Sequence, residues 1–142
     1  MSKPQYTFQP ITMIPIVLRI TDNMLIEAKE QLTNMKKVKE KPHILDDDIV
    51  ARSLKLYQGQ NDDSVHFLEQ CNIWKQEQLS ELQLTQVQKI ENYTHLLIDI
   101  NNQLIAIFKY CKDFTINKIL AKDDLELAFD FLTGKTDFLK DK

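Results

Sequence analysis

The sequence has little of the two residues that turn a chain. Among its 142 residues are four prolines, all within the first 42 positions, and only two glycines. A β-rich chain of this length needs many more turn formers, whereas helices joined by short polar turns do not. The composition therefore argues against a β-rich fold and predicts an all-α domain.

Cysteine is also scarce. The two cysteines, Cys71 and Cys111, are fewer than a small secreted fold normally carries in a disulfide framework. Both fall inside apolar patterns of helical spacing, where a free cysteine behaves as a small hydrophobic residue. We expect two reduced thiols in the core of a cytoplasmic protein.

Long apolar runs are absent. The longest, Ile11–Leu18, is interrupted by Thr12 and Pro15 and is too short to cross a bilayer. No small-residue cleavage site of a signal peptide follows it. The net charge of −3 disfavours wholesale binding to nucleic acid. We therefore expect no membrane span and no nucleic-acid partner.

Catalytic motifs are missing as well. Two glycines leave no phosphate-binding loop, and no Gly-x-Ser-x-Gly is present. The candidate metal ligands are His66, Glu69, Glu91 and His95. Their spacings, His-x-x-Glu and Glu-x-x-x-His, differ from the Glu-x-x-His of di-metal helical bundles. We therefore predict no catalytic residue, no cofactor and no metal.

The first twenty residues differ from the rest. They hold three of the prolines, and Ile14, Ile16 and Leu18 stand at alternate positions, which is typical of an extended segment. A lone strand cannot satisfy its own backbone hydrogen bonds. This arm is thus expected to cross the bundle, pair with residues before it, or pair with another chain. The first helix is predicted to start at Thr21 or Asp22, either of which can cap it.

Capping signals divide the middle of the chain. Asp46, followed by two more aspartates, predicts the start of a second helix. The weak pattern at Gly59–Ser64 predicts a break, with a further helical segment over Asp63–Leu79. Ser80 and Thr85 each begin a capping-box pattern, so either is expected to start the next and longest helix.

That longest helix, about Thr85–Lys112, is the clearest feature of the sequence. Its apolar surface is wider than one stripe, which predicts the spine of a bundle, covered on more than one side. Two shorter helices, Thr115–Leu120 and Asp123–Thr133, are predicted to follow, with Gly134 as a C-terminal stop. Seven residues recur along the spine at steps of three and four: Ile90, Tyr93, Leu97, Ile100, Leu104, Ile107 and Cys111.

The predicted fold is an all-α, elongated helical bundle of four or five helices with an extended N-terminal arm. The arm comprises residues 1–20, the bundle domain 21–135 and a frayed tail 136–142. The spine's surplus apolar surface is covered either by the chain's own helices or by a second copy or partner, and the sequence leaves both alternatives open.

We therefore expect a cytoplasmic interaction or scaffold module, not an enzyme, that self-associates as a homodimer. An alternative is a small-molecule binding module with a pocket near Trp74 and Tyr93, and a metal-dependent bundle enzyme ranks third. Asn101 would fix the register if it is buried at a helix seam. The candidate interface consists of Ile14, Ile16, Leu18, Tyr93, Leu97, Ile100, Asn101, Leu104 and Phe108.

Overall fold

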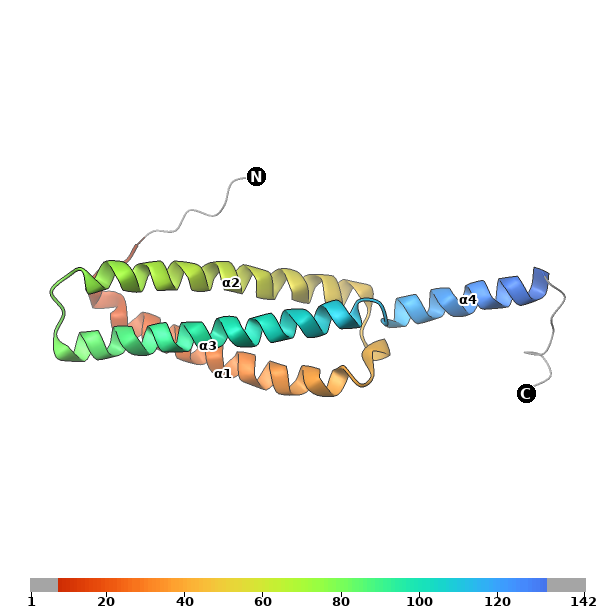
Figure 1. Ribbon diagram of the computed structural model, residues 1–142, viewed down its shortest axis with the longest axis horizontal. Coiled ribbons are helices and arrows are strands. Elements are labelled where there is room, and N and C mark those ends of the chain that lie inside the picture. The colour runs from red at the N-terminus through yellow and green to blue at the C-terminus, as the bar shows by residue number, and fades with distance from the viewer. Residues whose placement is uncertain (1–7, 133–142) are drawn as a thin grey trace.

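The computed structural model describes residues 8–132, and in this part of the chain all regular structure is helical. Three long helices lie side by side as an elongated bundle, and a fourth projects from one end of it (Figure 1). The all-α prediction is confirmed, but the bundle holds three helices rather than four or five. In chain order the elements are η1 (Ile11–Met13), α1 (Ile14–Val38), η2 (Pro42–Ile44), α2 (Asp47–Lys75), α3 (Glu81–Cys111) and α4 (Ile116–Leu132).

Helix α3 is the central element. It packs along both α1 and α2, whereas α1 and α2 approach each other closely at few points. Its 31 residues span about 46 Å at ~1.5 Å per residue. The broad apolar surface predicted for this helix is thus covered on two sides by the chain itself.

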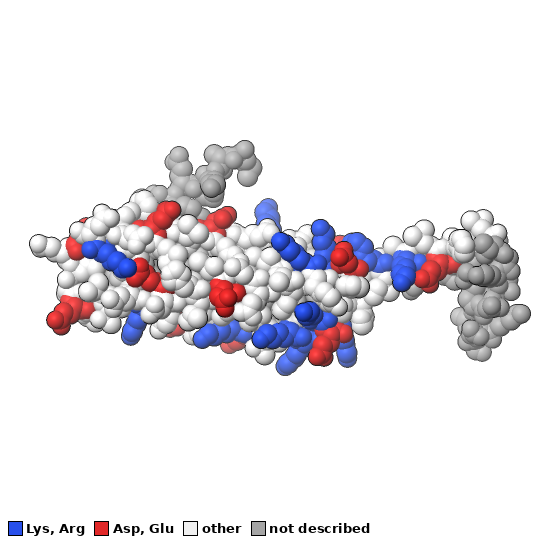
Figure 2. All heavy atoms as spheres, in the orientation of Figure 1, with Lys and Arg blue, Asp and Glu red and all other residues white. Residues whose placement is uncertain are grey.

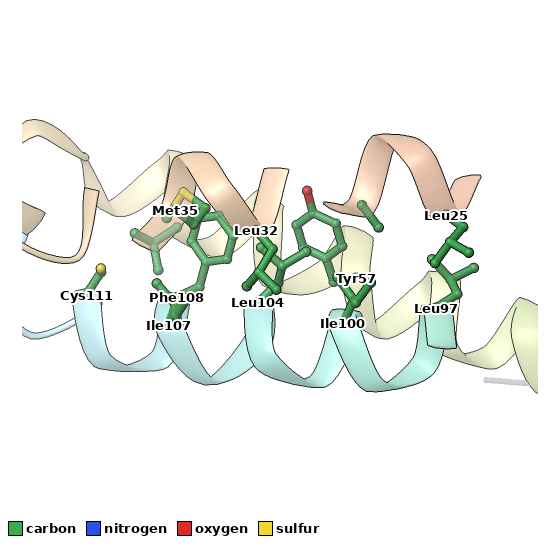
Figure 3. Close-up of a cluster of buried hydrophobic side chains, with 12 residues drawn as sticks. Leu25, Leu32, Met35, Tyr57, Leu97, Ile100, Leu104, Ile107, Phe108 and Cys111 are labelled. Carbon is green, nitrogen blue, oxygen red and sulfur yellow. The ribbon is translucent and has the colours of Figure 1, made fainter. Parts of the chain in front are cut away.

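Two clusters of buried side chains form the core. The larger lies between the three helices toward the end from which α4 projects, and Tyr57 stacks there on Phe108 with ring centroids 5.9 Å apart (Figure 3). The smaller cluster lies at the other end of the bundle, which we call the far end. It is formed by Ile14, Val17, Cys71, Trp74, Val87 and Ile90.

The predicted extended arm is wrong for residues 14–20, because α1 begins at Ile14. Pro15 lies in the first helical turn, where its missing N–H would have no intrahelical partner in any case. Ile14 and Val17 are core residues. Thr21 is buried too and donates from Oγ1 to the Val17 carbonyl at 3.0 Å, so it is not an N-cap. Of the alternating isoleucines only Ile14 is buried, whereas Ile16 and Ile20 are exposed. The buried stripe therefore follows helical spacing through Ile14, Val17 and Thr21.

The segment before α1 is held by side chains of α2 and not by a strand partner. The indole N–H of Trp74 donates to the Gln9 carbonyl at 2.9 Å, and the Gln9 N–H donates to Gln70 Oε1 at 2.5 Å. These bonds satisfy backbone groups that a lone extended segment would leave unpaired. Residues 1–7 of the predicted arm lie outside the described residues.

Helix α2 has no break. It runs through Gly59, and Ser64, in the stretch where a break was predicted, is buried and donates to the Gln60 carbonyl at 2.8 Å within the helix. Asp46 is confirmed as the N-cap, since its Oδ1 accepts from the Ile49 N–H at 2.7 Å. The weak sequence pattern reflects a run of glycine and polar residues on a continuous helix, of which Gly59 and Asp62 are exposed and Ser64 is buried.

The ends of the last two helices differ from the prediction in detail. Ser80, not Thr85, starts α3 through a capping box with Gln83, in which both reciprocal hydrogen bonds form. The two short helices predicted for the tail are one helix, α4. The Gly134 stop and the frayed tail, residues 136–142, lie outside the described residues.

Because α2 is continuous and a Cβ built on Gly59 has no atom within 4 Å, we expect Gly59→Ala to stabilise the protein. The gain in the free energy of unfolding is about 0.5–1 kcal/mol, since alanine loses less conformational entropy in a helix. Urea unfolding followed by circular dichroism measures it. A loss of stability would mean that the helix breaks at this glycine.

Candidate functional site

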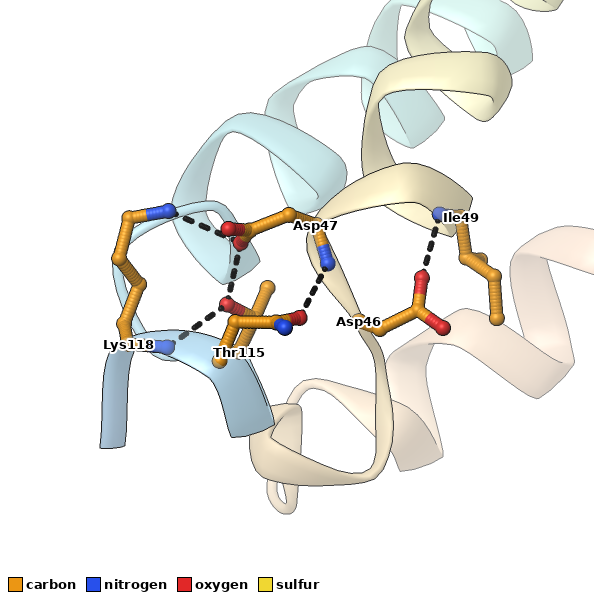
Figure 4. Close-up of polar contacts among 6 residues, drawn as sticks. Asp46, Asp47, Ile49, Thr115 and Lys118 are labelled. Atoms are coloured by element: carbon orange, nitrogen blue, oxygen red, sulfur yellow. Dashed lines mark hydrogen bonds and ion pairs between the residues drawn. The ribbon is translucent and has the colours of Figure 1, made fainter. Parts of the chain in front are cut away.

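The base of α4 is tied to the start of α2 by a small set of polar contacts, which we call the α4 anchor (Figure 4). The Ile116 N–H donates to the Leu45 carbonyl at 2.9 Å. The Asp47 N–H donates to Asn117 Oδ1, also at 2.9 Å. These two N–H groups lie at helix starts and have no intrahelical partners. Each is satisfied by an acceptor close to the start of the other helix.

The Asp47 carboxylate is the centre of the α4 anchor. Its Oδ1 accepts from Thr115 Oγ1 at 2.6 Å and from Lys118 Nζ at 2.8 Å. These hydrogen bonds, first from Lys118 and then from Thr115, lower the pKa of Asp47 below its ordinary value. The two adjacent aspartates thus have separate roles, because Asp46 caps α2 while Asp47 holds α4.

Beyond this anchor, α4 stands clear of the bundle. Among the described residues it packs closely against η2 but along none of the three long helices. Leu120, Leu125 and Leu132 are 55, 72 and 83 % exposed. Burying a leucine is worth about 1.5–3 kcal/mol, and contiguous exposed apolar groups mark interaction surfaces. The distal part of α4 is therefore the strongest candidate binding element.

A hollow of about 450 Å³ lies beside the base of α4. Its walls come from the first turns of α2, the end of α3 and the start of α4. Val50, Ala51 and Leu54 supply apolar wall, and three lysines surround it. The full lining is Asp47, Val50, Ala51, Leu54, Lys55, Gln58, Lys112 and Lys118.

Basic side chains gather at this end of the bundle. Figure 2 shows Lys and Arg concentrated toward the half of the molecule from which α4 projects. The lysines of the hollow and those near the end of α1, such as Lys36 and Lys37, both contribute. An acidic or otherwise anionic partner is favoured here over a basic one.

Six of the nine interface residues proposed from the sequence lie inside the bundle. Of the remaining three, Ile16 is exposed, while Leu18 and Tyr93 are partly buried. The apolar surface of the longest helix is thus largely covered by the chain's own helices, the first of the two alternatives. Six of the nine are core residues with no surface for a second chain: Ile14, Leu97, Ile100, Asn101, Leu104 and Phe108.

Asn101 is buried at a seam, but the seam lies within one chain. Its Nδ2 donates to Gln60 Oε1 of α2 at 3.2 Å, while its Oδ1 accepts no hydrogen bond from the described residues. A buried amide with a single partner costs stability, but such a residue favours the one packing in which its partner is reached. The register that it favours is that of α2 against α3.

Two of the four residues considered for metal binding, Glu91 and His66, contact other side chains of the bundle. Glu91 pairs with Lys75 Nζ at 2.5 Å, and His66 stacks on Phe8 with centroids 5.1 Å apart. Within residues 8–132, no three His, Cys, Asp or Glu side chains are grouped to hold a metal ion. Trp74 is fully buried at the far end, so the hollow does not lie where the sequence placed a pocket.

Neither the hollow nor the exposed α4 was expected from the sequence. The one signal for α4 is that apolar side chains in residues 116–132 are spread widely around the helix axis, which a single packed face does not require.

Comparison with protein-family models, with curated proteins and with solved structures finds no match to this chain. No helix of the described part is long and apolar enough to span a membrane.

We expect Asp47→Ala to loosen α4 without unfolding the bundle. Hydrogen exchange measured by mass spectrometry should become faster in residues 116–119 and stay unchanged in the middle of α3. Asp48→Ala is the matched control, since Asp48 pairs with Arg52 on the same helix and not with α4. Equal effects of the two substitutions would argue against the α4 anchor.

The same anchor should respond to acid. The folded pKa of Asp47 lies below the ordinary value of an aspartate, so its contribution to stability is fully present above that ordinary value and is lost as the pH falls through the folded pKa. The acid-induced increase in exchange at residues 116–119 should be absent in Asp47→Ala, which is already loosened.

Cys71 should make stability fall in alkali. Burial, and secondarily the Glu91 carboxylate, raise the pKa of its thiol to about 12 from 9.0. Between these values the folded state keeps a proton that the unfolded state has lost, so the free energy of unfolding falls as the pH rises. Urea unfolding from pH 7 upward should show a shallower decline in Cys71→Ala. Identical slopes would contradict a protonated buried thiol.

Proposed function

We propose that the protein is an interaction module that self-associates through α4. The observation that supports this is the exposure of Leu120, Leu125 and Leu132 on a helix that is anchored at its base only. A partner that covers this surface removes its apolar side chains from water, which the bundle beside it does not do, and that burial stabilises the complex.

Helix stability supports the same proposal. The 17 residues of α4 are close to the length of about 12–15 residues below which isolated helices are marginal in water. Most helices gain their stability from the packing of an apolar face. Among the described residues, helix α4 lacks that packing along most of its length, so a second molecule is the natural source.

The energies favour a two-fold dimer over a single helix docking. Three leucines buried at about 1.5–3 kcal/mol each barely offset an association cost of about 4–15 kcal/mol. In a symmetric dimer each copy contributes the same surface, so the free energy gained by burying leucines doubles. The entropic cost of losing translational freedom is the same as for a single contact. We therefore propose a homodimer.

The buried cysteines support two further parts of the proposal, the absence of enzymatic activity and the cytoplasmic location. Cys71 and Cys111 are free and buried, and burial raises the pKa of both thiols, which makes them poor nucleophiles. We propose a non-enzymatic protein of the cytoplasm, where thiols stay reduced.

A small-molecule binding module is the second candidate. The volume of the hollow, about 450 Å³, lies within the range of about 300–1,000 Å³ typical of ligand pockets. Its apolar wall and lysines favour an amphiphilic anion. A rise in melting temperature with such ligands, absent in Leu54→Asp, would favour this candidate.

The test of self-association is the mass in solution. We expect light scattering after size exclusion to give twice the chain mass of 16.7 kDa for the full-length protein. Leu125→Asp with Leu132→Asp should give a monomer, because each copy loses the surface that it contributes. Far-UV circular dichroism confirms that the bundle is intact.

The matched control is Leu82→Asp. Leu82 is 67 % exposed, comparable to the α4 leucines, but lies at the start of α3 at the far end. This variant should remain a dimer. A wild-type monomer, or a dimer indifferent to the α4 substitutions, would refute self-association through α4.

A further inference from the structure

We infer that the distal half of α4, residues 123–132, binds in the hollow of a second copy, and that the second copy's α4 binds reciprocally in the hollow of the first. This inference rests on the proposed function and names the surface that receives α4. Charge, chemical character, length and direction support it.

The charges of the two surfaces are complementary. Residues 123–132 contain four acidic residues and no basic one, and Asp124 and Glu126 are exposed. The hollow is lined by three lysines and one acid, Asp47.

Two lysines of the hollow and two acids of the helix are available to a second chain: Lys55, Lys112, Asp124 and Glu126. Asp47 is already occupied by Lys118 and Thr115. No ion pair engages Lys55, Lys112 or Asp124 within the described part of the chain, and Glu126 meets Lys122 only at 4.0 Å in an exposed pair. Opposed surfaces of this kind attract before contact and fix the orientation of docking.

The apolar parts also correspond. The hollow offers Val50, Ala51 and Leu54 on one side of α2, and the distal half of α4 offers Leu125 and Leu132. At ~1.5 Å per residue, ten residues of α4 span about 15 Å. The α2 lining from Asp47 to Gln58 spans about 18 Å on the same basis. One half-helix therefore fits one hollow.

The direction of α4 favours a second copy over its own chain. Lys118, in the first turn of α4, lines the hollow, but the helix then leads away from the bundle (Figure 1). Residues 123–132 thus do not reach the hollow beside their own base. A two-fold axis close to α4 sets the hollow of each copy along the distal helix of the other, and the interface closes with two identical contacts.

Charge reversal tests this arrangement directly. The hollow variant carries Lys55→Glu and Lys112→Glu, and the helix variant carries Asp124→Lys and Glu126→Lys. In either variant alone, positions 124 and 126 of the helix and positions 55 and 112 of the hollow carry charges of the same sign at both contacts. In an equimolar mixture, the acidic positions 124 and 126 of the first variant meet the basic hollow of the second, and the positions 124 and 126 that are basic in the second variant meet the acidic hollow of the first.

We expect each variant alone to dissociate with a Kd raised at least about tenfold, as for close charge pairs across interfaces. The mixture should form a heterodimer with a Kd within a few-fold of the wild-type value. Native mass spectrometry distinguishes the heterodimer from the two homodimers by mass. Lys55→Glu alone, which leaves the C-terminus of α3 intact, repeats the test with a smaller effect.

The control for net charge is Lys36→Glu with Lys37→Glu, two exposed lysines near the end of α1 outside the hollow. This variant should dimerise as the wild type does. Equal weakening by this variant would attribute the effect to overall charge and overturn the inference.

The outcomes separate the inference from the proposed function. A dimer that is lost in Leu125→Asp with Leu132→Asp but kept in both charge variants would leave α4 as the interaction element and exclude the hollow as its site. Monomeric variants whose mixture also stays monomeric would exclude the reciprocal pairing. A wild-type monomer would overturn both.

Discussion

The packing of α3 against two helices at once is the constraint on which the rest of the structure depends. Leu97 and Leu104 of this helix are fully buried, and the larger core cluster surrounds them from both sides. Since α1 and α2 approach each other closely at few points, each is held mainly through α3. A fourth helix packed within the same chain is not needed to bury this helix, and α4 is consequently left outside.

This division separates two kinds of apolar surface. Side chains of the three-helix bundle pack against each other, whereas Leu120, Leu125 and Leu132 of α4 remain exposed beyond an anchor built of polar groups. An anchor centred on Asp47 fixes where α4 starts without covering its sides. Helix α4 is directed outward from the bundle (Figure 1). Reciprocal exchange of a helix between two copies requires this geometry.

Sequence patterns identified the helices better than their ends or their partners. The 3-4 spacing of the spine and the caps at Asp46 and Ser80 are local signals, and they agree with the structure. Pro15 was misinterpreted because a proline in the first turn of a helix costs little. Gly59 was misinterpreted because the cost of a single glycine, about 1 kcal/mol, does not interrupt a helix that packs along α3 on both sides of it. The anchor joins residues some 70 positions apart, for which the sequence holds no local signal.

The position of Trp74 has an optical consequence. It is the one tryptophan of the chain, it is fully buried at the far end, and its indole is bonded to the segment before α1. Its fluorescence therefore responds to the folding of the bundle and to the docking of that segment, while events at α4 lie beyond its surroundings. The molecule thus contains a natural spectroscopic probe that separates loss of folding from loss of association.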